Sequence, residues 1–165
     1  MAKIYLILII LTLTTINGVS QTLTGKIFEI GGDKKDCKVY GECDCCTSEI
    51  YFINDKQFAL FDYCTYDHTL STGNYKIVSN ILTLTFKQTS VTNGTDEEGG
   101  KPYLKKQKVE IKPVTFSLGK CDNGAFMLEN KEFKDYKFGL RKNDKGEAKL
   151  IADFLKTDEW KLILE

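Results

Sequence analysis

The chain is poor in the residues and motifs that most enzymes use for catalysis. His68 is its only histidine, so any mechanism that needs an imidazole base must use that residue. The sequence contains no glycine-rich phosphate loop, no GxSxG and no HExxH pattern. Asp and Glu are scattered, and no spacing singles out a carboxylate pair of the glycosidase kind. We therefore predict a protein that is not an enzyme and that uses no cofactor.

Net charge and long apolar runs are also lacking. The 23 Lys and Arg residues balance 23 Asp and Glu residues, which leaves no net field to attract nucleic acid or anionic lipid. The apolar run from Ile4 to Leu13 is shorter than the roughly twenty residues that a transmembrane helix needs. We expect neither a nucleic-acid partner nor stable membrane insertion.

The N-terminal segment has the features of a signal peptide. Lys3 precedes the apolar run, and Gly18 and Ser20 place small residues at the two positions that a signal peptidase inspects. We predict that residues 1–20 are removed during export and that residues 21–165 form a single domain, soluble in a periplasm or secreted. No cysteine follows the run before Cys37, so a lipid-anchored form is not indicated.

Alternation of apolar and polar residues with period two dominates residues 21–165. In Ile81–Phe86, for example, Leu82, Leu84 and Phe86 fall on one side. Further strand candidates cover residues 23–30, 49–53, 57–63, 75–78, 103–112, 114–118, 126–128 and 136–140, with turn-forming residues between them. This pattern predicts a mainly all-β fold, an antiparallel barrel or sandwich of about eight to nine strands.

The C-terminal region breaks the strand pattern once. Residues Glu147–Lys156 place Leu150, Ile151, Phe154 and Leu155 on one face and are the only helix that we expect. Trp160–Leu164 is expected to form a last strand that pairs with the first.

Residues 92–100 are polar and rich in glycine, so we expect an exposed loop there. The lysines that follow it form either an anion-binding stripe or a solvated strand face that discourages edge pairing, and we favour the second. These lysines are Lys101, Lys105, Lys106, Lys108 and Lys112.

Six cysteines in an exported domain predict disulfides, because thiols pair in oxidising compartments. The candidates are Cys37, Cys43, Cys45, Cys46, Cys64 and Cys121. Six cysteines allow fifteen pairings, and the sequence does not choose among them. Cys45 and Cys46 are adjacent and are expected to bond different partners, since a bridge between neighbours is strained.

Two alternatives use the same residues. Cys43, Cys45 and Cys46, with His68 as a fourth ligand, could bind a soft metal ion or exchange disulfides, although a single CxCC without a second knuckle is a weak zinc signal. A hydrolase could use His68 with Cys64 and a nearby Asp, which would require His68 to lie in a cleft beside an unpaired Cys64 or a carboxylate.

Aromatic residues crowd the middle strands. In a small barrel they either line a pocket for an apolar ligand or fill the core, and the core interpretation is favoured. The candidate pocket residues are Tyr51, Phe52, Phe58, Phe61, Tyr63 and Tyr75.

Residues Gly73–Phe86 resemble the G-x-Y-x-I-x-x-N-x-L-x-L-x-F hairpin of small exported lipocalin-like (calycin-type) barrel proteins of bacteria. The resemblance covers this hairpin alone and implies an up-and-down barrel of about eight strands. Fold, compartment and missing motifs together favour an exported binding or interaction domain. Its partner would be a small apolar ligand in the barrel or a protein on a loop face.

Overall fold

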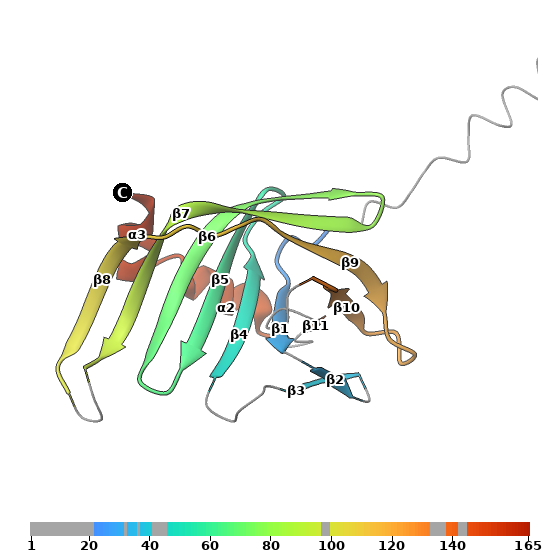
Figure 1. The fold of residues 1–165 in the computed structure, drawn as a ribbon, viewed down its shortest axis with the longest axis horizontal. Helices are drawn as coiled ribbons and strands as arrows, with labels where there is room; N and C mark the ends of the chain where they lie inside the picture. The colour runs from blue at the N-terminus through green and yellow to red at the C-terminus, as the bar shows by residue number, and fades with distance from the viewer. Residues whose placement is uncertain are drawn as a thin grey trace, which may run out of the picture.

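The computed structural model describes residues 22–31, 33–35, 37–40, 46–96, 100–132, 138–141 and 145–165. The main sheet holds nine strands (Figure 1): β1 (Ile27–Gly31), β4 (Cys46–Phe52), β5 (Gln57–Cys64), β6 (Asp67–Val78), β7 (Ile81–Thr95), β8 (Pro102–Lys108), β9 (Val114–Lys120), β10 (Phe126–Glu129) and β11 (Phe138–Arg141). A separate hairpin joins β2 (Asp33–Lys35) to β3 (Lys38–Tyr40). Two helices follow, α2 (Glu147–Phe154) and α3 (Asp158–Leu164).

Eight of the strands close into a barrel whose neighbours follow chain order. The order is β1, β4, β5, β6, β7, β9, β10 and β11, each pair is antiparallel, and β11 pairs with β1 to complete the circle. β8 is an additional strand that pairs with the C-terminal half of β7. The predicted mainly all-β fold is confirmed. Closure removes the sheet edges except where β8 is added.

Apolar side chains fill the barrel. The interior residues come from alternate positions of the strands and include Phe28, Ile50, Phe52, Phe58, Leu60, Tyr75, Leu82, Leu84, Phe86, Val114, Phe116 and Leu128. The space that Ile50, Leu84 and Phe116 border with their neighbours has a free volume of about 0 Å³. Ligand pockets begin at roughly 300 Å³, so this interior is a packed core.

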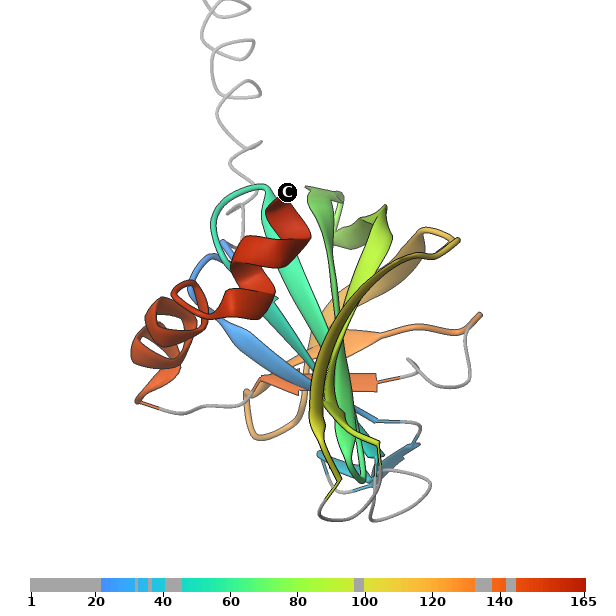
Figure 2. The same cartoon turned by 90° about the vertical axis from the view of Figure 1, so that its left-hand side faces the viewer.

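The two helices cover part of the outer surface of the barrel, where they lie together on one side (Figure 2). Ile151, Phe154 and Ile163 pack there against outward-facing residues of β1, β4, β5, β6 and β7. Buried Glu147 ties α2 to the barrel, because its carboxylate accepts hydrogen bonds from the Ile27 backbone N–H (3.2 Å) and from the Arg141 guanidinium (3.0 Å). The predicted helix over residues 147–156 is thus confirmed as α2.

Two sequence-based expectations for these regions are wrong. Residues 160–164 form helix α3 rather than a last strand, and β11 instead pairs with β1. The Thr157 side chain accepts a hydrogen bond from the Trp160 backbone N–H and caps this helix, a signal that outweighs the short alternation after it. Residues 92–95, expected in a loop, continue β7 because they pair with both β6 and β8.

An irregularity in the β6–β7 ladder determines where the barrel opens. Ser71 pairs with Ser90, but Gly73 pairs with Phe86, so β7 carries two more residues than β6 across this interval. Before the irregularity β7 pairs with β9 through residues 81–84, and after it with β8 through residues 89–95. We call the end formed by the β5–β6 turn, the C-terminal half of β7 and β8 the open end.

The predicted signal peptide lies outside the described residues. Among the residues that are described, no helix is long and apolar enough to cross a membrane.

Candidate functional site

The inner surface of the barrel changes from apolar to polar toward the open end. On β5 the inward positions run from Phe58 and Leu60 to Asp62, and Asp62 accepts a hydrogen bond from Ser48 of β4 (2.6 Å). On β6 and β7 the inward hydroxyls of Thr69 and Thr92 lie 3.2 Å apart. Polar side chains buried in a core are costly unless they are hydrogen-bonded, so such a lining belongs at a surface that meets water or a polar ligand.

A glycine brings together two polar side chains at this end. Gly94 of β7 lies opposite Asp67 of β6 on one side and opposite Tyr103 of β8 on the other. A Cβ at Gly94 would lie 2.3 Å from the Asp67 Cβ and 2.7 Å from the Tyr66 carbonyl oxygen. Because Gly94 has no side chain, the Tyr103 hydroxyl reaches across it and donates to the Asp67 carboxylate (3.1 Å).

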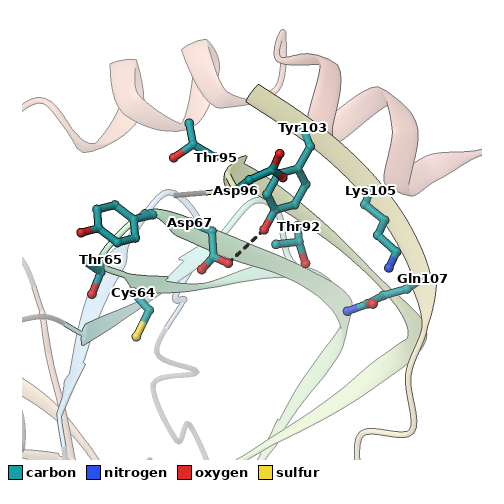
Figure 3. Close-up of a pocket in the computed structure, with 10 residues that line it drawn as sticks. Cys64, Thr65, Asp67, Thr92, Thr95, Asp96, Tyr103, Lys105 and Gln107 are labelled. Atoms are coloured by element: carbon teal, nitrogen blue, oxygen red, sulfur yellow. Dashed lines mark hydrogen bonds between the residues drawn. The ribbon is translucent and has the colours of Figure 1, made fainter. Parts of the chain in front are cut away.

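These residues line an open groove of about 790 Å³, which we call the inner groove (Figure 3). Its lining is Cys64, Thr65, Tyr66, Asp67, Thr92, Thr95, Asp96, Tyr103, Lys105 and Gln107. The volume lies within the range of small-molecule sites, roughly 300–1,000 Å³. The mouth of a barrel is a common place for such sites.

Charges are separated along the inner groove. Asp67 and Asp96 lie at the end of the groove beside the β5–β6 turn, whereas Lys105 and Gln107 lie farther along β8 (Figure 3). The carboxylates accept hydrogen bonds, the ammonium group only donates, and the amide does both. The groove therefore suits a polar ligand with donor groups at one end and an anionic or acceptor group at the other.

A second polar cluster lies on the outer surface of the barrel, on the side that the two helices cover. The Tyr51 hydroxyl donates to buried Glu49 (3.0 Å). Burial, then the negative charge of Glu49, raise the pKa of Tyr51 above its usual range. The same two causes raise the pKa of Tyr63 to about 12, against an opposing hydrogen bond with Tyr51. Both phenols therefore stay protonated at neutral pH, and the Tyr51 hydroxyl is the one that donates to the buried carboxylate.

His68 belongs to this outer cluster rather than to the inner groove. Its Nε2 lies 3.1 Å from Glu159 of α3, and Asn93 of β7 donates to the same carboxylate. The His68 ring also lies 5.4 Å from the Tyr63 ring, centroid to centroid. These contacts attach α3 to β6 and β7. The hydrolase alternative needs a carboxylate beside His68, and Glu159 occupies that place. Cys64 points to the opposite face of the hairpin, because residues alternate along β5 and β6, although Cys64 and His68 both border a groove of about 730 Å³ around the β5–β6 turn.

The six aromatic residues named as a candidate pocket are divided between two surfaces. Phe52, Phe58 and Tyr75 point into the barrel core. The other three, Tyr51, Phe61 and Tyr63, point outward and pack beneath the helices. Successive residues of a strand face opposite sides, so the pairs 51–52 and 58–61 could not share one pocket.

The structure describes the side chains of three of the six cysteines. Cys43 and Cys45 lie outside the described residues, as does the side chain of Cys46. Among the cysteine side chains that are described, those of Cys37, Cys64 and Cys121, no two are joined, so the predicted disulfide framework is not supported there. The described residues also contain no group of three or more His, Cys, Asp or Glu side chains that could hold a metal ion, and the proposed CxCC ligands fall outside them.

Sequence reasoning did not identify Asp67, Tyr103, Lys105 and Gln107 as neighbours. Asp67 is the first residue of β6 and the other three belong to β8, and only the strand register brings them together. One signal was present in the sequence: a glycine within a polar strand, here Gly94, often marks a place where two backbones approach closely.

Comparison of the chain with family models, with curated proteins and with solved structures found no match.

Proposed function

We propose that this chain is an exported, non-catalytic binding domain and that the inner groove is its ligand site. The observation that carries the proposal is a groove of about 790 Å³ with separated donor and acceptor groups, at the open end of a barrel whose interior is filled. The signal-peptide pattern supports export. The resemblance of residues Gly73–Phe86 to a lipocalin-like hairpin is consistent with a binding role.

The ligand that fits this groove is polar. An apolar ligand would have to enter the barrel core, where Phe116 and Leu84 are each about 1% exposed and leave little space between them. A ligand in the inner groove instead meets the Asp67 carboxylate, the Thr92 hydroxyl and the Lys105 ammonium group. Charge-assisted hydrogen bonds to such groups are stronger than neutral ones, so a zwitterionic or hydroxylated molecule is favoured.

Titration of the ¹⁵N-labelled protein with the dipeptide Ala-Ala, with N-acetylglucosamine and with palmitate, followed by NMR, tests the proposal. We expect a polar probe to shift the amide signals of Asp67, Thr92 and Tyr103, and palmitate to leave Leu84 and Phe116 unchanged. Palmitate shifting the core signals, or neither polar probe shifting the groove signals, would contradict the proposal.

Two adjacent lysines provide a matched pair of variants for the same titration. Lys105 lines the inner groove, whereas Lys106 points to the other face and donates to the Leu162 carbonyl of α3. Lys105→Ala should weaken binding of the dipeptide by about tenfold, the effect of losing one charge-assisted hydrogen bond. Lys106→Ala should leave it unchanged, and equal effects of both variants would exclude the inner groove as the site.

We further propose that Cys46 and Cys64 form one of the disulfides expected of an exported protein. They are register partners on β4 and β5. The Ile53 backbone N–H donates to the Gln57 carbonyl, so 53–57 is a hydrogen-bonded position, and alternation makes 46–64 a non-hydrogen-bonded one. The Cα atoms of such pairs lie about 4.5 Å apart, within the range that a disulfide spans. Cys64 carries no free thiol, which supports the proposal.

Thiol labelling tests this bond. Oxidation removes two protons and two electrons from the two thiols, and a disulfide oxidant in the compartment of export accepts them. Labelling of the unfolded, unreduced protein with iodoacetamide should leave Cys64 unmodified. Cys46→Ser should make Cys64 reactive, whereas Cys37→Ser should not. Protection of Cys64 that persists in Cys46→Ser would place the bond elsewhere.

A further inference from the structure

β8 is the terminal strand of the nine-stranded sheet, and its second edge is open. It pairs with β7 on one side, and no other described strand pairs with it on the other. Figure 1 shows it as the outermost strand at the end of the sheet away from β9. Its residues are exposed along nearly the whole strand. An open edge presents backbone donors and acceptors to which another extended chain can pair.

The strand register identifies which backbone groups face outward. The Val109 backbone N–H donates to the Gln88 carbonyl, so 88–109 is a hydrogen-bonded position of the β7–β8 ladder. Every second pair of an antiparallel ladder is hydrogen-bonded, so the pairs 90–107, 92–105 and 94–103 are hydrogen-bonded as well. The backbone groups of residues 103, 105 and 107 therefore point toward β7. The N–H and C=O groups of Leu104, Lys106 and Lys108 consequently face the open edge.

The side chains along this edge carry positive charge on both faces. Lys105 points into the inner groove, and its neighbour Lys106 points to the outer face. Lys106 and Lys108 lie on the same face of β8. The acidic residues nearby are Asp96 and Glu110 beyond the two ends of β8, and Asp158 and Glu159 of α3, which lie beside Leu104 near the start of the strand. Two copies of β8 paired edge to edge would place lysines near lysines, which disfavours self-association. An incoming strand with acidic side chains would instead place opposite charges across the new ladder.

We propose that β8 is a docking edge for an acidic, extended peptide segment of a partner protein, which pairs with the backbone of Leu104, Lys106 and Lys108. The backbone bonds supply affinity that is independent of sequence, and the lysines select acidic residues at the alternate positions. The proposal does not depend on the inner groove, because the outward backbone groups belong to the opposite edge of β8 from β7.

A proline at residue 106 separates edge pairing from charge. Its ring removes an outward N–H and obstructs an added strand, yet the ladder to β7 uses residues 103, 105 and 107 and is retained. The probe is a fluorescein-labelled peptide of alternating Glu and Val, followed by anisotropy at low salt. We expect Lys106→Pro to weaken binding by at least about tenfold and Lys106→Ala by only about twofold to fivefold.

Two control peptides keep the test independent of how the variants fold. An alternating Lys-Val peptide should not bind the unchanged protein, and the Glu-Val peptide with N-methyl groups on one edge should lose its binding. Groove variant Tyr103→Phe should bind the Glu-Val peptide as the unchanged protein does. Equal binding of the acidic and basic peptides, binding that survives N-methylation, or dimerisation of the protein through β8 would overturn the proposal.

Discussion

Phe116→Ala should lower the free energy of unfolding by about 3–5 kcal/mol, the usual cost of removing a fully buried aromatic side chain. Phe116 is 1% exposed and lies in the barrel core with Ile50, Leu84 and Val114. Its removal takes away buried apolar surface and leaves a cavity that the closed ladder cannot easily fill. Urea unfolding followed by circular dichroism measures the change.

The matched control is Tyr66→Ala in the β5–β6 turn. Tyr66 is 50% exposed, so its loss should change the stability by no more than about 0.5 kcal/mol. A loss below about 1 kcal/mol for Phe116→Ala would indicate that the barrel interior is loosely packed. The core would then be open to an apolar ligand, contrary to the filled barrel described above.

Gly73→Ala should also destabilise the protein strongly, by about 3 kcal/mol, because the added methyl group meets backbone. Its Cβ would lie 2.1 Å from the Thr85 carbonyl oxygen and 2.9 Å from the Phe86 Cα. Neither atom can move without distorting β7. Gly73 is at the irregularity where β7 changes its pairing, so the strain would fall on the segment that separates the closed core from the open end.

Gly119→Ala is the control for this substitution. A Cβ at Gly119 would lie 3.1 Å from the terminal methyl group of Met127, a flexible side chain that can move aside. Its change in stability should stay within about 1 kcal/mol, and thermal unfolding of the two variants gives the comparison. Similar melting temperatures for both would show that β6 and β7 do not approach each other closely at Gly73.

Much of the fold could be predicted from alternation, because the barrel strands bury one face in a common core. The first part of β7 was predicted from the alternation of Leu82, Leu84 and Phe86, and all three side chains are buried as expected. The second part could not be found this way. Its inward positions carry the hydroxyl side chains of Ser90 and Thr92 and then Gly94, which has no side chain, so the apolar alternation on the inner face ends while the strand continues.

The same limit explains α3. Trp160, Leu162 and Leu164 alternate as in a strand, but the buried residue is Ile163, which packs beneath the helix against the outer surface of the barrel. The sequence signals for this helix were the capping residue Thr157 and the acidic residues Asp158 and Glu159 in the first turn, because both features favour a helix N-terminus.

The candidate site was less predictable than the fold. A contact such as that between Tyr103 and Asp67 depends on two registers and on a missing side chain between them, at Gly94. The aromatic cluster was visible in the sequence, yet its division between the core and the outer surface follows only once each strand is assigned a face. The many aromatic residues of the middle strands predicted aromatic packing, but the strand register determines which of them pack in the core and which pack on the outer surface.

The most direct measurement is of intermolecular nuclear Overhauser effects between the bound dipeptide and the protein. A ligand in the inner groove should give contacts to the ring protons of Tyr103 and to the Thr92 methyl group. Contacts to Leu84, Val114 and Phe116 would instead place the ligand inside the barrel and contradict the assignment of the groove as the binding site.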